Sequence, residues 1–294
     1  MLDWDDVRVF LAVARAGQIL GAARALGLNH ATVARRLTAL ETAFGSELVR
    51  RHTNGTDLTA EGETFLIHAE RMESEMLAAS EAAGAARAAL SGTVRIGAPD
   101  GFGTGFLAPR LAELSARHPD LTLELVPVPR AFSLSRREAD IAVTVERPRE
   151  GRLVARKLVD YRLGLYAAPA YLEAHGMPRS RDDLARHRLV GYVEDLIFSP
   201  SLAFNAEFSR DWRSSIAVSS ALGQIAAVRA GAGIGVLHAF MAHADPGLVP
   251  VLPATTLTRA YWTVVHEDLR TIRRIQAVAA FLAELVARER ALFA

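Results

Sequence analysis

The strongest constraint in this sequence is an apolar repeat that runs from residue 65 to residue 90. Its members are separated by four and three residues in strict alternation, which is the heptad spacing of a helix that packs against another helix. The repeat consists of Phe65, Ala69, Met72, Met76, Ala79, Ala83, Ala86 and Leu90. Because Thr59 is a suitable N-cap and acidic residues follow it, we expect one helix from Thr59 to about Leu90.

An apolar seam along a single helix has nothing to bury against, so the repeat predicts a partner helix and assigns its members to dimerisation. The alternative is that the seam packs on the C-terminal part of the chain. Helices this long seldom pack on one domain along their whole length, so dimerisation is favoured. The helix also divides the chain into residues 1–59, the helix itself at 60–91, and residues 92–294.

Composition limits the classes of function. A length of 294 residues suggests about two domains, and 50% hydrophobic with 23% charged residues is typical of a folded globular protein. No apolar run reaches the ~18 residues of a membrane span, and the first residues lack a signal-peptide pattern, so we expect a cytoplasmic protein without a membrane partner. The absence of cysteine excludes disulfides and thiolate chemistry. Because the net charge is only +1, any surface for nucleic acid must be local.

Three helices are predicted ahead of the heptad helix. Residues 4–16 carry apolar side chains at helical spacing and end at Gly17, and the alanine-rich residues 19–26 end at Gly27. Asn29 is a favoured N-cap for the third helix.

The third helix has two faces. Val33, Leu37, Leu40 and Phe44 recur at intervals of four, three and four, toward a small core, whereas Arg35 and Thr38 point away. Two helices joined by a short glycine-containing turn, with a polar outer face on the second, indicate a helix-turn-helix that presents this second helix to the major groove of DNA.

A basic cluster and a hairpin accompany these helices. Between residues 24 and 52, five arginines face only two glutamates, so this stretch has a net charge of +3. Asn54-Gly55 between two short extended runs is a strong hairpin signal, because both turn residues adopt positive φ. The hairpin would complete a winged helix-turn-helix and could place Arg50, Arg51 and His52 beside the phosphate backbone.

Strand-like and helical patterns alternate after residue 92, which predicts α/β units with a mostly parallel sheet. We expect strands at 94–98, 121–126, 141–145, 163–167 and 261–265, and helices at 106–117, 221–230 and 269–292.

Residues 3–62, "DWDDVRVFLAVARAGQILGAARALGLNHATVARRLTALETAFGSELVRRHTNGTDLTAEG", closely resemble the N-terminal domain of LysR-type transcriptional regulators. The runs "GTVRIGAPDGFGTGFLAPRLAELSARHPDLTLELV", "RREADIAV", "LGLYAAPAYLEAHGMP" and "AVRAGAGIGVL" resemble the effector-binding domain of the same family, in the same order. The resemblance implies a winged helix-turn-helix, a linker helix and a two-lobed α/β effector domain of the type 2 periplasmic-binding-protein kind. Lobe 1 would combine residues of about 93–160 with 266–294, and lobe 2 would span about 161–265.

The resemblance also implies partners. They are double-stranded promoter DNA carrying an interrupted inverted repeat, a small-molecule effector, further copies of the chain in a dimer or tetramer, and RNA polymerase. No cofactor, metal or enzymatic activity is implied.

The departures from the family pattern fall on the DNA-facing surface. Gln18 and Leu20 stand where small hydroxyl residues are usual, and residues 29–34 depart from a Ser-Gln-Pro…Ser pattern. These departures concern base preference and some phosphate contacts, not the fold. The predicted DNA-contacting residues are Gln18, Asn29, His30, Thr32, Arg35, Arg36, Arg50, Arg51 and His52.

An effector would sit between the lobes, where helix N-termini and strand ends meet. Candidate walls come from "PDGFGT", from "VSSALGQ", from residues 130–132 and from the loop around residues 194–200. An acid at Asp100 would repel a carboxylate unless Arg130 compensates, so the charge of the effector is left open. The candidate effector residues are Asp100, Gly101, Phe102, Gly103, Thr104, Arg130, Phe132, Glu194, Phe198, Ser219 and Ser220.

Several simpler interpretations compete with these predictions. The first three helices could form a plain helical core, His30 could merely solvate a helix start, and Arg36 could pair with Glu41 or another acid. The glycine-rich runs lack nucleotide-binding spacing, the histidines lack metal-ligand spacing, and no G-x-S-x-G elbow is present. Two alternative functions are a ligand-independent DNA-binding regulator and a cytoplasmic small-molecule-binding protein or enzyme.

Overall fold

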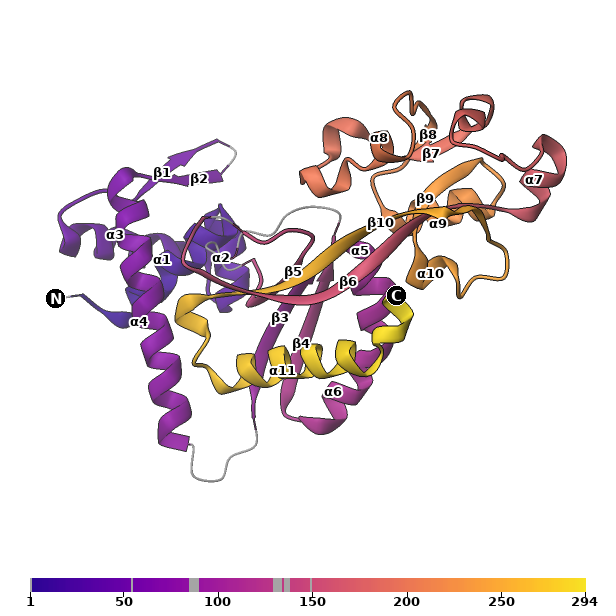
Figure 1. The fold of residues 1–294 in the computed structure, drawn as a ribbon. Helices are drawn as coiled ribbons and strands as arrows, with labels where there is room; N and C mark the ends of the chain where they lie inside the picture. The colour runs from indigo at the N-terminus through magenta and orange to yellow at the C-terminus, as the bar shows by residue number, and fades with distance from the viewer. Residues whose placement is uncertain (1, 54, 85–89, 129–133, 135–137, 149) are drawn as a thin grey trace. The chain divides into compact units, whose positions relative to one another are not determined.

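The computed structural model describes the chain except residues 1, 54, 85–89, 129–133, 135–137 and 149. The chain divides into two compact units, one containing residues 1–88 and the other containing most of residues 89–294 (Figure 1).

The N-terminal unit begins with three helices, α1 (Trp4–Ala16), α2 (Ile19–Leu26) and α3 (His30–Phe44). Each forms where the sequence predicts it, because a glycine ends every one of them and the side chains of Asp3 and Asn29 cap α1 and α3. The Asn29 side chain accepts a hydrogen bond from the backbone N–H of Thr32 at 2.7 Å, which starts α3. Gly27 ends α2 with φ of 64°, a left-handed conformation that only glycine adopts readily. The predicted helix-turn-helix is therefore confirmed.

Strands β1 (Val49–His52) and β2 (Gly55–Leu58) pair antiparallel and form the predicted hairpin. Their base is fixed by Glu41, whose carboxylate accepts hydrogen bonds from the backbone N–H groups of Leu48 and Val49 at 3.0 and 3.1 Å. The helices α1, α2 and α3 share one apolar core with the start of this hairpin. Within that core Val33, Leu37 and Leu40 are buried as expected.

Phe44 departs from the prediction. Its side chain is 43% exposed, and its ring touches Phe65 edge-on with a centroid distance of 4.9 Å. It lies at the margin of the core because α3 ends there.

Helix α4 (Ala60–Gly84) follows the hairpin. It begins at the predicted cap, since the Thr59 hydroxyl accepts a hydrogen bond from the Gly62 N–H at 3.0 Å. The assignment of Phe65 and Ala69 to dimerisation is corrected here, because both are buried in the core of their own unit. Met72, Met76 and Ala79 are exposed along the helix.

The end of the predicted seam differs as well. Helix α4 is described only to Gly84, the side chain of Ala83 and all of Ala86 lie outside the described residues, and Leu90 lies beyond the helix.

The C-terminal unit is built on one eight-stranded sheet with the order β4-β3-β5-β10-β6-β9-β7-β8. The strands are β3 (Gly92–Ala98), β4 (Leu121–Pro127), β5 (Ile141–Thr144), β6 (Leu153–Ala167), β7 (Leu189–Gly191), β8 (Ser214–Ala217), β9 (Ile234–His238) and β10 (Val249–His266). The predicted α/β class is confirmed, but the sheet is mixed. Strand β3 runs parallel to β4 and β5, and β7 runs parallel to β8 and β9, whereas β10 is antiparallel to β5 and β6, and β6 is antiparallel to β9.

The two long strands β6 and β10 were only partly predicted. They pair with each other over nearly their whole lengths and pass from one half of the sheet into the other (Figure 1). Residue 160, where the lobe boundary was expected, therefore lies inside β6. The predicted segments, 163–167 and 261–265, are the mostly buried parts of these strands, whereas most of the remaining residues are half-buried or exposed.

Helices cover the sheet. They are α5 (Asp100–Phe102), continued by a π-helical turn (Gly103–Leu107) and a 3₁₀ turn (Ala108–Arg110) into α6 (Leu111–Arg117), then α7 (Pro169–His175), α8 (Asn205–Phe208), α9 (Ala221–Arg229), α10 (Ala239–Ala242) and α11 (Arg273–Arg288). The helical segment predicted at 106–117 starts earlier, at Asp100. Short 3₁₀ turns occupy Asp182–Arg186, Glu194–Leu196, Pro200–Leu202, Glu267–Leu269 and Arg290–Phe293. None of the described helices has the length and apolarity that crossing a membrane requires.

Candidate nucleic-acid interface and effector pocket

The outer face of α3 is the first candidate interface. Arg35, Thr38 and His30 are exposed, opposite the buried Val33 and Leu37. The half-buried Thr32 lies at the N-terminal end of the helix, where the side chain of Asn29 caps its backbone N–H. Gln18 is exposed at the N-cap position of α2, where its side chain makes no capping hydrogen bond.

Arg36 has a different role from its neighbour Arg35. Its guanidinium contacts Asp6 at 3.0 Å and Asp5 at 3.5 Å, and so ties α3 to the first turn of α1. This corrects the prediction that both arginines face DNA. The pairing partner is an acid of the first helix rather than Glu41, whose carboxylate holds the hairpin.

The hairpin is the second element of this interface. Arg50, Arg51 and His52 are exposed on β1. Successive residues of a strand point to opposite faces, so Arg50 and Arg51 cannot both approach one phosphate from the same side. The imidazole Nε2 of His52 lies 3.2 Å from the carboxylate of Asp57 on the partner strand.

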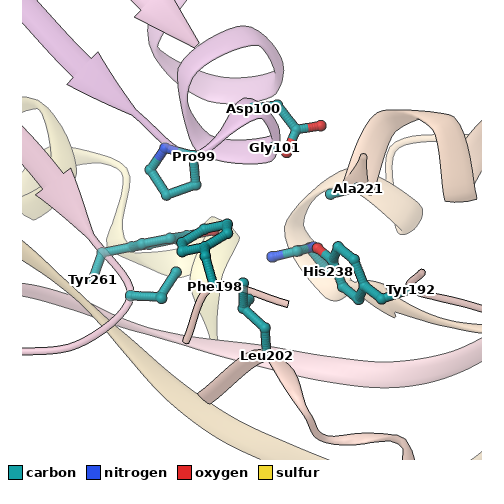
Figure 2. Close-up of a pocket in the computed structure, with 10 residues that line it drawn as sticks. Pro99, Asp100, Gly101, Tyr192, Phe198, Leu202, Ala221, His238 and Tyr261 are labelled. Atoms are coloured by element: carbon teal, nitrogen blue, oxygen red, sulfur yellow. The ribbon is translucent and has the colours of Figure 1, made fainter. Parts of the chain in front are cut away.

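The C-terminal unit contains a small pocket where elements from both halves of the sheet meet (Figure 2). It is lined by Pro99, Asp100, Gly101, Val145, Tyr192, Phe198, Leu202, Ala221, His238 and Tyr261. The cavity measures about 10 Å³, which is the space that one water molecule needs. A larger ligand therefore requires the surrounding elements to separate.

Asp100 bridges this pocket. Its side chain is buried, and its Oδ2 accepts hydrogen bonds from the Ser220 hydroxyl at 2.6 Å and from the Leu222 N–H at 3.3 Å. Ser220 also caps α9 by accepting from the Gly223 N–H at 3.1 Å. Figure 2 shows Asp100 facing the start of α9, where Ala221 lies. A carboxylate at this position is favoured by the N–H groups and dipole of the helix.

Aromatic rings form the floor of the pocket. Tyr261 stacks on Tyr161 with ring centroids 4.1 Å apart, and His238 also stacks on Tyr161 with centroids 5.2 Å apart. Burial lowers the pKa of His238 to about 4, so the imidazole is neutral near pH 7. Burial raises the pKa of Tyr192 and Tyr261, which keeps both hydroxyls protonated.

The structure separates the predicted effector residues. Asp100, Gly101 and Phe198 line the pocket, and Ser220 contacts it through Asp100. Phe102 and Gly103 are buried beside it, where the Phe102 ring packs against Tyr261 at 4.8 Å. Three further residues, Thr104, Glu194 and Ser219, do not line it, and Thr104 does not cap a helix because the helix already starts at Asp100. The remaining two, Arg130 and Phe132, lie outside the described residues.

Comparison with known families decides the identity. Residues 4–63 match the bacterial regulatory helix-turn-helix protein, lysR family, and residues 87–287 match the LysR substrate binding domain. The chain belongs to the LysR family of transcriptional regulators.

Its relatives are regulators of transcription, not enzymes. The chain is 28% identical to the HTH-type transcriptional regulator CrgA of Neisseria meningitidis serogroup C (strain 8013), over 95% of this chain and 96% of that one. It is 34% identical to an HTH-type transcriptional regulator of Xanthomonas campestris pv. campestris (strain 8004), over 63% of this chain and only 54% of that relative. The solved structure of CrgA from Neisseria meningitidis, a LysR-type transcriptional regulator, superposes with a TM-score of 0.59 at 27% identity, covering 97% and 99% of the two chains.

Sequence reasoning missed several lining residues of this LysR-type regulator. His238 ends β9, Tyr261 lies in β10, and Tyr192 follows the last residue of β7, so the three are far apart in the sequence. No local motif marks them, since each is a single buried residue in a strand or directly after one. The described residues of the regulator contain no cluster of three or more histidine, aspartate or glutamate side chains arranged to hold a metal ion.

Proposed function

We propose that two copies of this LysR-type regulator bind an interrupted inverted repeat in promoter DNA, each placing α3 in the major groove. The observation that carries the proposal is the division of α3 into two faces. Val33 and Leu37 are fully buried, whereas Arg35 is exposed on the opposite side. A helix whose apolar face is buried in its own domain and whose outer face carries an exposed guanidinium is suited to bidentate contacts with guanine.

The contacts around α3 follow from exposure and chemistry. Asn29, His30 and Thr32 would meet DNA at the start of the helix, and Gln18 at the start of α2 would meet the backbone. Arg50, Arg51 and His52 on the wing would contact phosphates, with Arg50 and Arg51 serving different sides of the hairpin. Arg36 would act indirectly by holding α3 against Asp6.

Dimerisation would use the exposed part of α4. Met72 is 39% exposed and Met76 52% exposed, and Ala79 is exposed one turn further along. These residues keep the heptad spacing, so a second copy of α4 could cover them. Pairing two copies gives the symmetry that an inverted repeat requires, and two dimers would form a tetramer.

A small-molecule effector would bind in the pocket around Asp100. It would favour one arrangement of the two halves of the sheet, joined by β6 and β10, and differential affinity for two arrangements is what shifts an equilibrium. That shift would alter DNA binding or contact with RNA polymerase. Because its target is promoter DNA, we place the regulator in the cytoplasm.

The test is fluorescence anisotropy of the full-length protein with DNA from beside its own gene and with scrambled DNA of equal length. Arg35→Ala should reduce the preference for the specific DNA by about 5-fold to about 100-fold, the range of one base contact. Arg50→Ala should weaken both DNAs equally and reduce the steepness of the salt dependence by about 0.9.

Arg210→Ala is the matched control, because it removes an exposed arginine from the C-terminal unit. It should leave both affinities unchanged. If Arg35→Ala behaves like Arg210→Ala on both DNAs, α3 does not read the bases and the proposal fails.

A further inference from the structure

The pocket around Asp100 contains a buried carboxylate but no lysine or arginine. Among the residues that line it, Asp100 is the only acid and none is a lysine or arginine, while His238 is neutral near pH 7 and the other lining side chains are apolar or phenolic. Asp100 is only 9% exposed. A buried carboxylate without a counter-charge is unfavourable, and a cation placed beside it relieves that cost.

The hydrogen bonds of Asp100 leave one of its oxygens open. Both the Ser220 hydroxyl and the Leu222 N–H donate to Oδ2, and no described residue donates a hydrogen bond to Oδ1. The anion-binding position at the start of α9 is therefore filled by a carboxylate of the protein itself. A carboxylate ligand would have to displace it and would lie beside a second negative charge.

Arg259 is a described cation near the pocket, and its guanidinium is paired elsewhere. Arg259 is close enough to Tyr161 to influence its pKa, but its guanidinium is paired with Glu207 and donates to the Ser201 carbonyl. It therefore does not neutralise Asp100 from the pocket side.

The walls of the pocket suit a cation as well. Tyr192, Phe198 and Tyr261 are labelled around the same space in Figure 2, with Asp100 at its edge. The faces of aromatic rings attract an ammonium group by their quadrupole, most strongly where water is excluded. Tyr261 adds a buried hydroxyl that has no hydrogen-bond partner of normal geometry among the described residues.

We propose that the effector of this regulator is a small organic cation, an amine in its ammonium form, held by Oδ1 of Asp100 and by the rings of Tyr192, Phe198 and Tyr261. This rests on the proposed function, in which the pocket is the effector site. Because the cavity holds only about one water, the amine binds as the two sides of the pocket move apart. Asp100 then exchanges part of its contact with α9 for the ligand.

The first test uses the wild-type full-length protein and three compounds of one shape: benzylammonium chloride, benzyl alcohol and sodium benzoate, at equal ionic strength. Benzylammonium should raise the unfolding temperature by at least about 2 °C at millimolar concentration, since a ligand that binds only the folded state stabilises it. The alcohol should have less effect, and benzoate none. A larger shift with benzoate, or no shift with benzylammonium, overturns the proposal.

Three variants then locate the charge. Asp100→Asn should lower the affinity for benzylammonium at least about tenfold in a calorimetric titration, because it removes the ionic half of a charge-assisted hydrogen bond. Ser220→Ala removes the hydroxyl hydrogen bond to Oδ2 but keeps the carboxylate and the hydrogen bond from the Leu222 N–H, so it should lower the affinity less than Asp100→Asn does. Asp211→Asn removes an exposed acid outside the pocket and should behave as wild type. Unchanged affinity in Asp100→Asn refutes the proposal, and the wild-type comparison stands even if that variant fails to fold.

DNA binding separates this inference from the proposed function. If the unliganded protein binds its promoter and benzoate rather than benzylammonium changes that affinity, the regulator remains a ligand-controlled DNA-binding protein and only the cationic effector is wrong. If benzylammonium binds but no DNA does, the proposed function fails while the pocket assignment holds.

Discussion

Gly62, in the first turn of α4, is the position where a single methyl group should disturb the DNA-binding unit most. A Cβ atom added there would lie 2.0 Å from the carbonyl oxygen of Leu48 and 2.9 Å from its carbonyl carbon. Real Cβ atoms do not approach backbone atoms so closely, and backbone cannot rotate away as a side chain can. Gly62→Ala therefore forces the start of α4 away from the base of the β1–β2 hairpin.

The cost can be worked from the bonds at this junction. The Thr59 N–H donates to the Leu48 carbonyl at 3.1 Å, the Thr59 hydroxyl donates to the Glu47 carbonyl at 2.7 Å, and the Gly62 N–H donates to the Thr59 hydroxyl at 3.0 Å. Each bond contributes about 1 kcal/mol, and overpacking adds about 1–3 kcal/mol. Alanine returns up to about 1 kcal/mol through its higher helix propensity. If all three bonds are lost, the net expectation is a loss of about 3–5 kcal/mol from the N-terminal unit.

The assay is calorimetric unfolding of the full-length protein, with Thr64→Ala as the matched control. Thr64 is exposed on the same helix, and the same residue is introduced. Gly62→Ala should lower the temperature of the transition that includes the N-terminal unit by about 8 °C or more and weaken DNA binding, whereas Thr64→Ala should change that temperature by about 2 °C at most. An unchanged or higher unfolding temperature in Gly62→Ala would refute the close approach between α4 and Leu48.

Three other substitutions test separate parts of the regulator. Arg36→Ala should destabilise the N-terminal unit by about 0.5–1 kcal/mol, because its ion pairs are partly exposed, while leaving base preference unchanged in binding to specific and scrambled DNA; a change in preference would place Arg36 on the DNA after all. Met76→Glu should shift the protein toward monomers in analytical ultracentrifugation, whereas the neighbouring control Glu75→Gln should not. An unaltered oligomer in Met76→Glu would exclude this face of α4 as the dimer interface. Burial lowers the pKa of His238 to about 4 from about 6.5 in the unfolded chain, so the unfolded state binds the proton first. The free energy of unfolding is therefore highest above pH 6.5 and decreases by about 3 kcal/mol through this group as the pH falls to about 4. In acid-unfolding curves His238→Gln should show a smaller decrease, and parallel curves for the two proteins would contradict this prediction.

The N-terminal unit was predictable because its signals are local. The side chain of Asn29 caps its own helix, Gly27 ends its own helix, and the spacing of Val33, Leu37 and Leu40 marks a buried face within one helix. Such effects act over three or four residues, so they are visible in a linear sequence. The partner of Arg36 could not be predicted, because Asp6 lies thirty residues away in the sequence. The sequence does not distinguish an arginine that pairs with an acid from one that contacts a phosphate.

The heptad repeat shows the limit of periodic patterns. The repeat correctly predicted an apolar face on α4, but it did not predict which part of the protein packs against that face. Phe65 and Ala69 are covered by the core of their own unit, whereas Met72 and Met76 project beyond that core.

By itself the sequence determined the winged helix-turn-helix and the α/β class of the C-terminal unit, because caps, turns and hydrophobic periodicity are local. Only the tertiary structure decided the contents of the pocket. It brought Asp100 within 2.6 Å of Ser220, 120 residues away, and stacked Tyr261 on Tyr161 beneath them. The physical reason is that the charge and shape of a pocket depend on which strands become neighbours, and strand order is set by packing over the whole domain.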